Sequence, residues 1–211
     1  MGRWRVRGAG IAGGAEVILI PEIPYDINKV ADSIMQRTYS GKHFSIVAVS
    51  EGAMSMDTAD AQKEAEANLA EAKATYKQAK SGDDKKAKKK AKRKRKKAEE
   101  KLAEIEAIIK DSTHVLTSRL EEMTGLESRV TILGHVQRGG TPSPADRLLA
   151  TRLGTTCVHL INDGIHGCLV AYKGNDIVPV PFEEIMNSRN HVPLDHYWLK
   201  TARSVGTALG D

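Results

Sequence analysis

The order of apolar and polar positions predicts buried strands that alternate with amphipathic helices. Residues 15–20 and 44–49 are short runs rich in Val and Ile, which is typical of strands covered on both faces. Between them, apolar residues recur at helical spacing over residues 27–34, directly after Asp26 as a candidate cap, and Gly41 ends the connection. A strand, a helix and a second strand in this order predict a parallel crossover.

The second half of the chain continues the same pattern. Ser143, Pro144 and Asp146 combine a hydroxyl cap, a proline in the first turn and an acidic residue, and so predict the start of a helix. Gly125 is expected to end an earlier helix. The remaining expected elements are a helix around residues 116–123, strands at 129–133, 168–172 and 177–180, and a closing helix near 194–209. Together these elements predict an α/β fold.

Residues 58–109 interrupt this pattern and predict a helical hairpin. They are rich in Ala, Lys and Glu, and only residues 81–84 break the helical composition. Apolar residues recur in steps of three and four along both arms, and each arm of about 25 residues would reach roughly 35 Å. We therefore expect residues 1–57 and 110–211 to form one α/β domain, with 58–109 inserted as a charged hairpin. The seam residues are Ala65, Leu69, Ala72, Tyr76 and Ala79 on the first arm, and Ala91, Ala98, Leu102, Ile105 and Ile109 on the second.

The positive charge of the chain is concentrated in this hairpin. From residue 85 to residue 97, every position except Ala87 and Ala91 is Lys or Arg, which gives +11. Since the net charge of the whole chain is +5, the remainder carries −6. The basic run lacks aromatic residues that would stack on bases, so a solvated hairpin tip is favoured and nucleic acid is not expected as a partner.

Cysteine usage and hydropathy indicate a cytoplasmic protein. Cys157 and Cys168 have no metal-ligand spacing, and we interpret them as reduced thiols. The basic first residues followed by an apolar run resemble a secretory leader, but Glu16 and Pro21 interrupt the run. No stretch approaches the roughly 20 apolar residues that span a bilayer, so no membrane association is expected.

The glycines at positions 8, 10 and 13 match the G-x-G-x-x-G pattern of dinucleotide-binding loops. That pattern binds nucleotides when it follows a strand and opens a helix. Here it leads into the predicted strand at residues 15–20 instead. Tight backbone packing is therefore the favoured interpretation of Gly8, Gly10 and Gly13.

A glycine-flanked polar loop at residues 134–140 is the strongest candidate for a ligand site. Loops that follow a buried parallel strand face the ligand crevice of an open sheet. Arg138 offers a planar fork for phosphate, and His135 can donate to hydroxyl or phosphate oxygens. Glu51, at the end of the run 44–49, would lie at the same edge and could accept hydrogen bonds from sugar hydroxyls. The alternatives are a tight turn with solvated side chains and, for Glu51, a helix cap or a solvated carboxylate.

Arg129 begins the expected strand that His135 follows. Six residues of strand would separate the two by about 20 Å. Arg129 could then serve only the site of a neighbouring subunit, and the alternative is a surface arginine.

Several segments resemble the 6-phosphofructokinase family in order and approximate spacing. The similarity covers nearly all of the chain except the hairpin. The matching segments are Met-Gly-Arg at residues 1–3, Ile-Ala-Gly-Gly-Ala-Glu at 11–16, Ser-Glu-Gly at 50–52, Thr-Gly-Leu-Glu-Ser-Arg at 124–129, Leu-Gly-His-Val-Gln-Arg-Gly-Gly at 133–140 and Asp-Arg-Leu-Leu-Ala-Thr-Arg at 146–152.

This resemblance implies the carboxyl-terminal half of the phosphofructokinase fold, with a parallel-sheet Rossmann-like layer. It implies that Arg129 reaches the site of an adjacent subunit, and hence a homo-oligomeric parent enzyme. It also implies a contact of Arg3 with the transition state. The implied fructose 6-phosphate ligands are Met1, Gly2, Arg3, Glu51, Arg129, His135 and Arg138, and the implied nucleotide effector site contains Gly14, Glu16 and Lys42.

The sequence also departs from the family pattern. The family carries a Gly-Gly-Asp-Gly-Ser donor loop and a Thr-Ile-Asp-Asn-Asp segment with the catalytic base, and neither occurs here. Magnesium and the donor, ATP or pyrophosphate, would therefore be held outside this chain in the full-length enzyme, and the chain alone is expected to be inactive. We interpret it as a fragment of 6-phosphofructokinase, which forms fructose 1,6-bisphosphate in glycolysis. The alternative is a non-catalytic binding or assembly module that uses the sugar-phosphate pocket or the basic hairpin.

Overall fold

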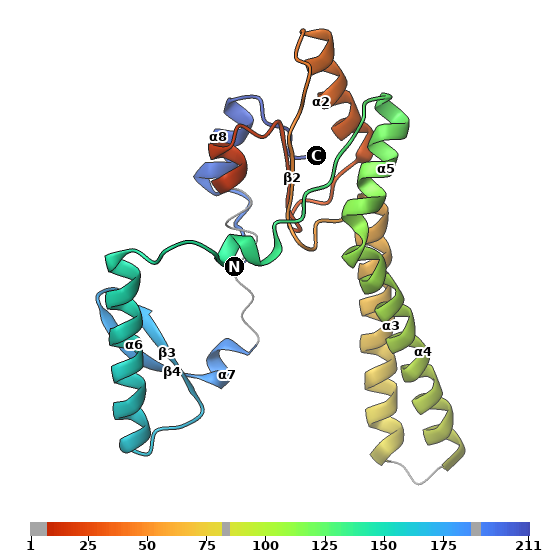
Figure 1. The fold of residues 1–211 in the computed structure, drawn as a ribbon. Helices are drawn as coiled ribbons and strands as arrows, with labels where there is room; N and C mark the ends of the chain where they lie inside the picture. Colours follow the sequence, from red (N-terminus) through yellow and green to blue (C-terminus); the bar gives the residue numbers. More distant parts are fainter. Residues whose placement is uncertain (1–7, 82–84, 187–190) are drawn as a thin grey trace. The chain divides into compact units, whose positions relative to one another are not determined.

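The computed structural model describes residues 8–81, 85–186 and 191–211. They fall into two compact units (Figure 1), each described by itself below. The first unit comprises Met1–Val130 and His191–Asp211, and the second comprises Thr131–Asn190.

The first unit is built on a parallel pair of strands, of which the first is fully buried and the second is half-buried. Strand β1 (Val17–Leu19) pairs with β2 (Val47–Val49), and helix α2 (Ile27–Tyr39) connects them. The Asp26 carboxylate caps α2 by accepting a hydrogen bond of 2.9 Å from the Asn28 N–H. On the opposite edge of β1, the Ile18 N–H donates to the Ala208 carbonyl at 2.9 Å. The predicted parallel crossover is therefore confirmed, although each strand is shorter than its apolar run.

Side chains of β1 alternate between two hydrophobic clusters. One face packs against α2 and α5 (Ser112–Thr124), and the other packs against α8 (Tyr197–Ser204). The first cluster contains Val17, Leu19, Tyr25, Val30, Ala31, Ile34, Ala53, Leu116 and Leu120, and the second contains Ala15, Ile18, Ile20, Ile23, Val192, Leu199, Ala202 and Leu209. The mixed α/β fold class is thus confirmed, with a layer on each face of the strand pair.

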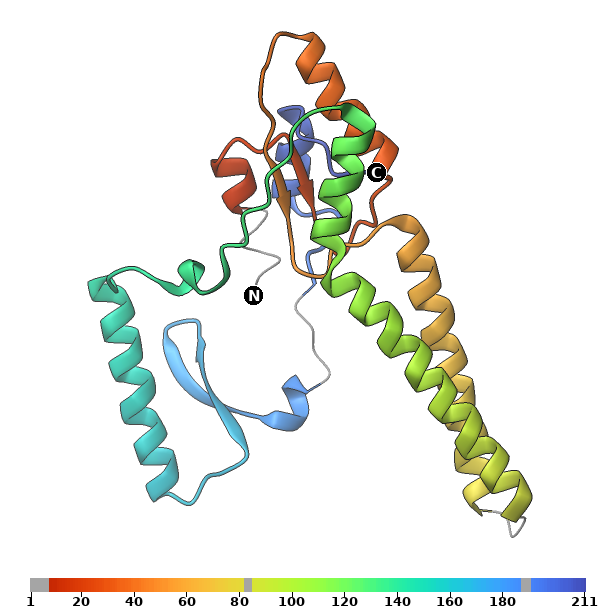
Figure 2. The same cartoon turned by 45° about the vertical axis from the view of Figure 1, so that its right-hand side comes forward.

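The expected helical hairpin is present in the first unit. Helices α3 (Met56–Ser81) and α4 (Lys85–Lys110) lie side by side (Figure 2). All ten predicted seam residues are buried or half-buried. The Arg95 guanidinium also lies over the Tyr76 ring, 4.9 Å from its centroid. The seam is mostly alanine, and it leaves a hollow of about 190 Å³ beside Ala72 and Ala98.

The second unit pairs one helix with a β-hairpin. Helix α6 (Pro144–Asn162) packs on β3 (Cys168–Lys173) and β4 (Asp176–Pro181), which pair antiparallel, and the short α7 (Phe182–Ile185) follows. The Arg152 guanidinium links α6 to this hairpin by donating to the Asn175 carbonyl at 2.7 Å.

A capping box begins α6, at the helix start that the sequence predicts. The Asp146 N–H donates to Ser143 Oγ at 3.2 Å, and the Ser143 N–H donates to Asp146 Oδ2 at 2.9 Å. These hydrogen bonds from Ser143, side chain first and backbone second, lower the pKa of Asp146. Because the folded-state pKa is lowered, the contribution of this contact to stability is present at neutral pH and is lost as the pH falls through that pKa.

The expected strand at residues 129–133 is not formed. These residues have no regular secondary structure, and Ile132 is 70% exposed. An apolar run becomes a strand only when neighbouring backbone accepts and donates its hydrogen bonds. Among the described residues, the sheet containing β1 has β2 as its one full partner strand, and no strand pairs with 129–133.

The glycine-rich segment before β1 packs tightly, as expected. Residues 8–12 are helical, and a Cβ added at Gly10 would lie 2.7 Å from Ile18 Cδ1 and 3.4 Å from Ala48 Cβ. A Cβ at Gly8 would lie 2.9 Å from the Trp198 ring. These glycines therefore allow close contact of the helical segment with the strand pair and α8.

We predict that Gly10→Ala destabilises the first unit by about 1–3 kcal/mol, because the added methyl group overpacks the Ile18 side chain in a buried layer. Urea unfolding monitored by tryptophan fluorescence measures the change, since both tryptophans of the chain belong to this unit.

Gly154→Ala is the matched control, since a Cβ there meets nothing within 4 Å and the position lies inside α6. Its higher helix propensity should leave stability unchanged or raise it by up to about 1 kcal/mol. Equal unfolding midpoints for Gly10→Ala and the unmodified chain would contradict the packing argument.

Candidate functional site

Glu51 lies at the carboxyl end of β2, where the sequence places it. The Ser50 N–H donates to the Leu19 carbonyl, and the Ala53 N–H donates to the Ser50 carbonyl, both at 2.9 Å. Gly52 has a φ of +83°, so the turn needs glycine at that position. These bonds hold the turn beside the buried strands while the Glu51 side chain is exposed. Its carboxylate is therefore presented for hydrogen bonding at the edge of the sheet.

The polar loop at residues 134–140 contains one turn of 3₁₀ helix, η1 (Gly134–Arg138). The Val136 N–H donates to the Leu133 carbonyl, and the Gly139 N–H donates to the Val136 carbonyl, each at 3.0 Å. Gly134 has a positive φ of +49°, so its place at the start of the turn depends on glycine. The turn is short and tightly closed, and it leaves the His135 side chain exposed. The Arg138 backbone completes the turn, and its side chain lies outside the described part of the structure.

Arg129 is held by a local ion pair. Its guanidinium donates to Glu127 Oε1 from Nη2 at 2.9 Å and from Nε at 3.1 Å. The Arg129 side chain is 84% exposed, and exposed pairs of this kind are worth at most about 1 kcal/mol. The guanidinium can therefore exchange Glu127 for an anionic ligand at little cost. The expected separation of about 20 Å between Arg129 and His135 assumed a strand at residues 129–133. Because these residues do not form a strand, the structure does not support that separation.

The expected sugar-phosphate ligands are distributed over the two units. Glu51 and Arg129 belong to the first unit, and His135 and Arg138 belong to the second. Residues 1–3 lie outside the described residues. The structure gives the local setting of Glu51, Arg129 and His135, while the assembly of one site from these residues stays a prediction.

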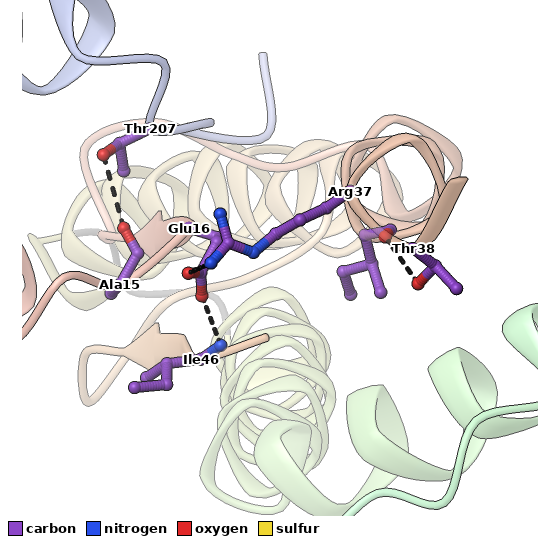
Figure 3. Close-up of polar contacts among 7 residues, drawn as sticks. Ala15, Glu16, Arg37, Thr38, Ile46 and Thr207 are labelled. Carbon is purple, nitrogen blue, oxygen red and sulfur yellow. Dashed lines mark hydrogen bonds and ion pairs between the residues drawn. The ribbon is translucent and has the colours of Figure 1, made fainter. Parts of the chain in front are cut away.

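Glu16, an expected effector ligand, is fully engaged within the first unit (Figure 3). Its Oε1 forms an ion pair with Arg37 Nη2 at 2.6 Å, and its Oε2 accepts a hydrogen bond from the Ile46 N–H at 2.5 Å. The carboxylate is only 12% exposed. Glu16 therefore links the start of β1 to the last turn of α2 and to the segment that enters β2.

The other two expected effector residues lie close to Arg37 and Glu16 in the chain. The Lys42 N–H donates to the Arg37 carbonyl at 3.2 Å, and the Lys42 side chain is exposed. Gly14 has a φ of +68° in the turn just before Glu16. The structure thus connects the Lys42 backbone to Arg37, whose guanidinium pairs with Glu16.

Sequence reasoning missed Arg37. It lies in the last turn of α2, where a cation is already expected because it complements the helix dipole. Because that local role already accounts for an arginine here, the sequence gives no indication of the contact with Glu16, which lies 21 positions earlier in the chain. Neither the position of Glu16 before β1 nor that of Arg37 within α2 indicates the pairing, because it depends on how the crossover packs.

The described residues contain neither a cluster of metal-binding side chains nor a membrane-spanning helix. No group of three or more His, Cys, Asp or Glu side chains is arranged to hold a metal ion within residues 8–81, 85–186 and 191–211. In the same residues, no helix combines the length and the apolar character required to cross a bilayer.

Comparisons with known proteins find a matching family and several similar curated proteins. The model of the family described as Phosphofructokinase matches residues 4–161. The chain is 46% identical over 208 residues to an ATP-dependent 6-phosphofructokinase of Propionibacterium freudenreichii, 41% over 208 residues to one of Spirochaeta thermophila, and 38% over 214 residues to one of Chloroflexus aurantiacus. These alignments cover 99%, 99% and 100% of the chain, and 51%, 48% and 49% of the relatives.

The chain thus spans about half the length of these curated relatives. The family match covers β1, β2, α2, the hairpin, α5, η1 and nearly all of α6. It includes the turn that carries Glu51 and the glycine-supported turn that carries His135 and Arg138. The chain belongs to the phosphofructokinase family.

Proposed function

We propose that this chain is the fructose 6-phosphate-binding half of an ATP-dependent 6-phosphofructokinase. The observation that carries the proposal is the similarity to a protein of that name over 99% of this chain and 51% of the relative. The whole enzyme would transfer a phosphoryl group to the 1-hydroxyl of fructose 6-phosphate. Binding of the sugar phosphate would be the contribution of the residues described here.

The local chemistry of each turn supports this assignment. Glu51 is an exposed carboxylate at the end of a parallel strand, where ligands of open α/β sheets bind, and it can accept hydrogen bonds from sugar hydroxyls. Arg138 supplies a guanidinium that is suited to bidentate contacts with a phosphate. His135 can donate to phosphate oxygens or hydroxyls from its exposed position.

The chemical step would depend on groups that this sequence does not contain. Phosphoryl transfer requires a positioned donor, neutralisation of its charge and an acceptor for the hydroxyl proton. The donor loop and the aspartate segment of the family are absent from the 211 residues. We therefore assign binding and orientation of the acceptor sugar to this chain, and ascribe no proton transfer to its residues.

We further propose that the parent enzyme is a homo-oligomer. Arg129 is 84% exposed and is paired only weakly with Glu127, so it can contribute to the site of an adjacent subunit. The second unit also exposes large apolar residues along α6, where Leu148 is 67% exposed and Val158 is 57% exposed. Exposed apolar surface of this kind supports packing against further polypeptide in the whole enzyme.

The geometry around Glu16 supports a proposed effector site for an anionic nucleotide. Arg37, in the last turn of α2, and Lys42, just after the helix, supply two cationic side chains, and the Lys42 N–H donates to the Arg37 carbonyl. Glu16 orients Arg37 through the 2.6 Å contact. We assign Lys42 to the phosphate groups, because its exposed ammonium has freedom to reach an incoming anion.

We predict that the purified 211-residue chain produces no fructose 1,6-bisphosphate from fructose 6-phosphate with magnesium and either ATP or pyrophosphate. The physical reason is the missing donor loop and proton acceptor. A coupled assay for the bisphosphate measures this, with an intact relative as the positive control. Turnover by the purified chain would show that donor-binding residues have been overlooked.

We predict that the chain binds fructose 6-phosphate and that Arg138→Ala weakens the binding at least about tenfold, which corresponds to the loss of a charge-assisted contact of roughly 1.4 kcal/mol. Isothermal titration calorimetry measures the dissociation constants.

Arg147→Ala is the matched control, because Arg147 is an exposed arginine on α6 in the same unit. It should bind within about twofold of the unmodified chain, since it removes the same charge without a phosphate contact. Equal losses for the two variants would refute the assignment of Arg138 and indicate a general effect of charge.

We predict that magnesium adenosine diphosphate raises the thermal midpoint of the chain and that Lys42→Gln abolishes the shift, because the ammonium would contact its phosphates. Lys29→Gln, an exposed lysine at the start of α2, should retain the shift. Differential scanning fluorimetry provides the measurement. Identical shifts for the two variants would exclude Lys42 from the effector site.

A further inference from the structure

The hairpin of α3 and α4 carries its two signs of charge at opposite ends. Residues 73–80 and 85–97, which we call the basic tip, contain 14 Lys and Arg and no Asp or Glu, for a net charge of +14. Residues 56–72 and 98–110, which we call the acidic base, contain 9 Asp and Glu and 3 Lys, for a net charge of −6. This segregation creates a strong local electrostatic field at the tip.

The structure directs most of the basic side chains to solvent. Along α4, the cations from Lys86 to Lys97 are exposed except for Arg95, which is half-buried over Tyr76. Ala91 is buried in the seam with α3. The ion pairs of Arg95 with Glu99 at 3.2 Å and of Lys96 with Glu100 at 3.6 Å lie at the boundary with the acidic base. The helix therefore presents a continuous cationic surface between the boundary and the end of the arm.

The sequence alone argues against nucleic acid because the basic run lacks aromatic residues for stacking, but that requirement applies to single strands. We propose instead that the basic tip docks double-helical nucleic acid through its phosphate backbone, without reading its sequence. The basic run of α4 holds 11 cations in 13 residues, or about one per 1.8 Å of helix axis. Duplex DNA carries one negative charge per roughly 1.7 Å of its axis. The two linear charge densities match, and the release of condensed counterions would drive the association.

Other polyanionic partners fit the surface less well. A lipid bilayer is best held when apolar residues insert beside the cations, and the run from residue 85 to residue 97 has only alanine between its charges. Single strands bind by stacking on aromatic rings, whereas the hairpin's Tyr76 is half-buried beneath Arg95. A second copy of the chain could offer its acidic base, but Glu64 and Asp60 there already pair with Lys101 and Lys63.

The test measures binding of the full chain to a fluorescein-labelled DNA duplex of about 20 base pairs by anisotropy, between about 50 and 200 mM NaCl. If about five phosphates are contacted, the logarithm of the association constant should fall with the logarithm of salt concentration with a slope near −4.5. Binding without salt dependence, or no binding at about 50 mM NaCl, would overturn the proposal.

A variant pair separates the position of the charges from their number. The tip variant replaces five exposed cations of α4, and the control variant replaces five exposed lysines elsewhere. We expect the tip variant to lose at least about tenfold in affinity and to show a shallower salt slope, and the control to stay within about twofold. The tip substitutions are K88Q, K89Q, K92Q, R93Q and K96Q, and the control substitutions are K29Q, K63Q, K110Q, K173Q and K200Q.

Circular dichroism checks the helix content of each variant. We expect it to be unchanged, because glutamine is nearly as good a helix former as lysine. The salt slope of the unmodified chain tests the proposal even if a variant fails to fold. Equal losses in the two variants would show that net charge alone drives binding, which overturns the assignment to the tip. Tighter binding to anionic vesicles, to polyglutamate or to a second copy of the chain than to the duplex would also overturn it.

Discussion

Burial of β1 on both faces and along both edges is the constraint on which the first unit depends. Val17, Ile18 and Leu19 are fully buried, so their side chains need apolar cover above and below the strand. Their backbone groups must also be paired, because unsatisfied N–H and C=O groups in the interior are costly. Strand β2 pairs one edge, and the segment at Ala208 pairs part of the other. The crossover helix and the carboxyl-terminal helix follow from these two requirements.

The same strand pair determines how two functional turns are presented. The turn that holds Glu51 follows β2 and is bonded back to the carbonyl of Leu19. At the opposite end, Glu16 precedes β1 and fixes the last turn of α2 through Arg37. The proposed sugar contact and the proposed effector contact therefore lie at opposite ends of one short parallel pair. A shift of either strand along the other would move the residues at both ends.

Local signals made much of the fold predictable. The cap at Ser143, the left-handed glycine at Gly125 and the three-four spacing of the hairpin each act within a few residues, and the structure forms all three. The strand expected at 129–133 failed because apolar composition reports a tendency to be buried and does not supply a pairing partner. The position of Glu51 at a strand end was predictable from element order. The Glu16–Arg37 pair was not, because it depends on the packing of α2 beside β1.

The hairpin begins and ends at adjoining points of the α/β part of the first unit. The Ser112 hydroxyl, at the start of α5, donates to the Ala53 carbonyl at 3.2 Å, just before α3 begins. Contacts within the α/β part therefore already hold together the two segments that flank the arms of the hairpin. The entropy lost in closing a loop grows only with the logarithm of its length. Evolution could therefore lengthen, shorten or recharge the arms at little cost to the sheet, which makes the hairpin a region where new binding properties can arise independently of sugar-phosphate chemistry.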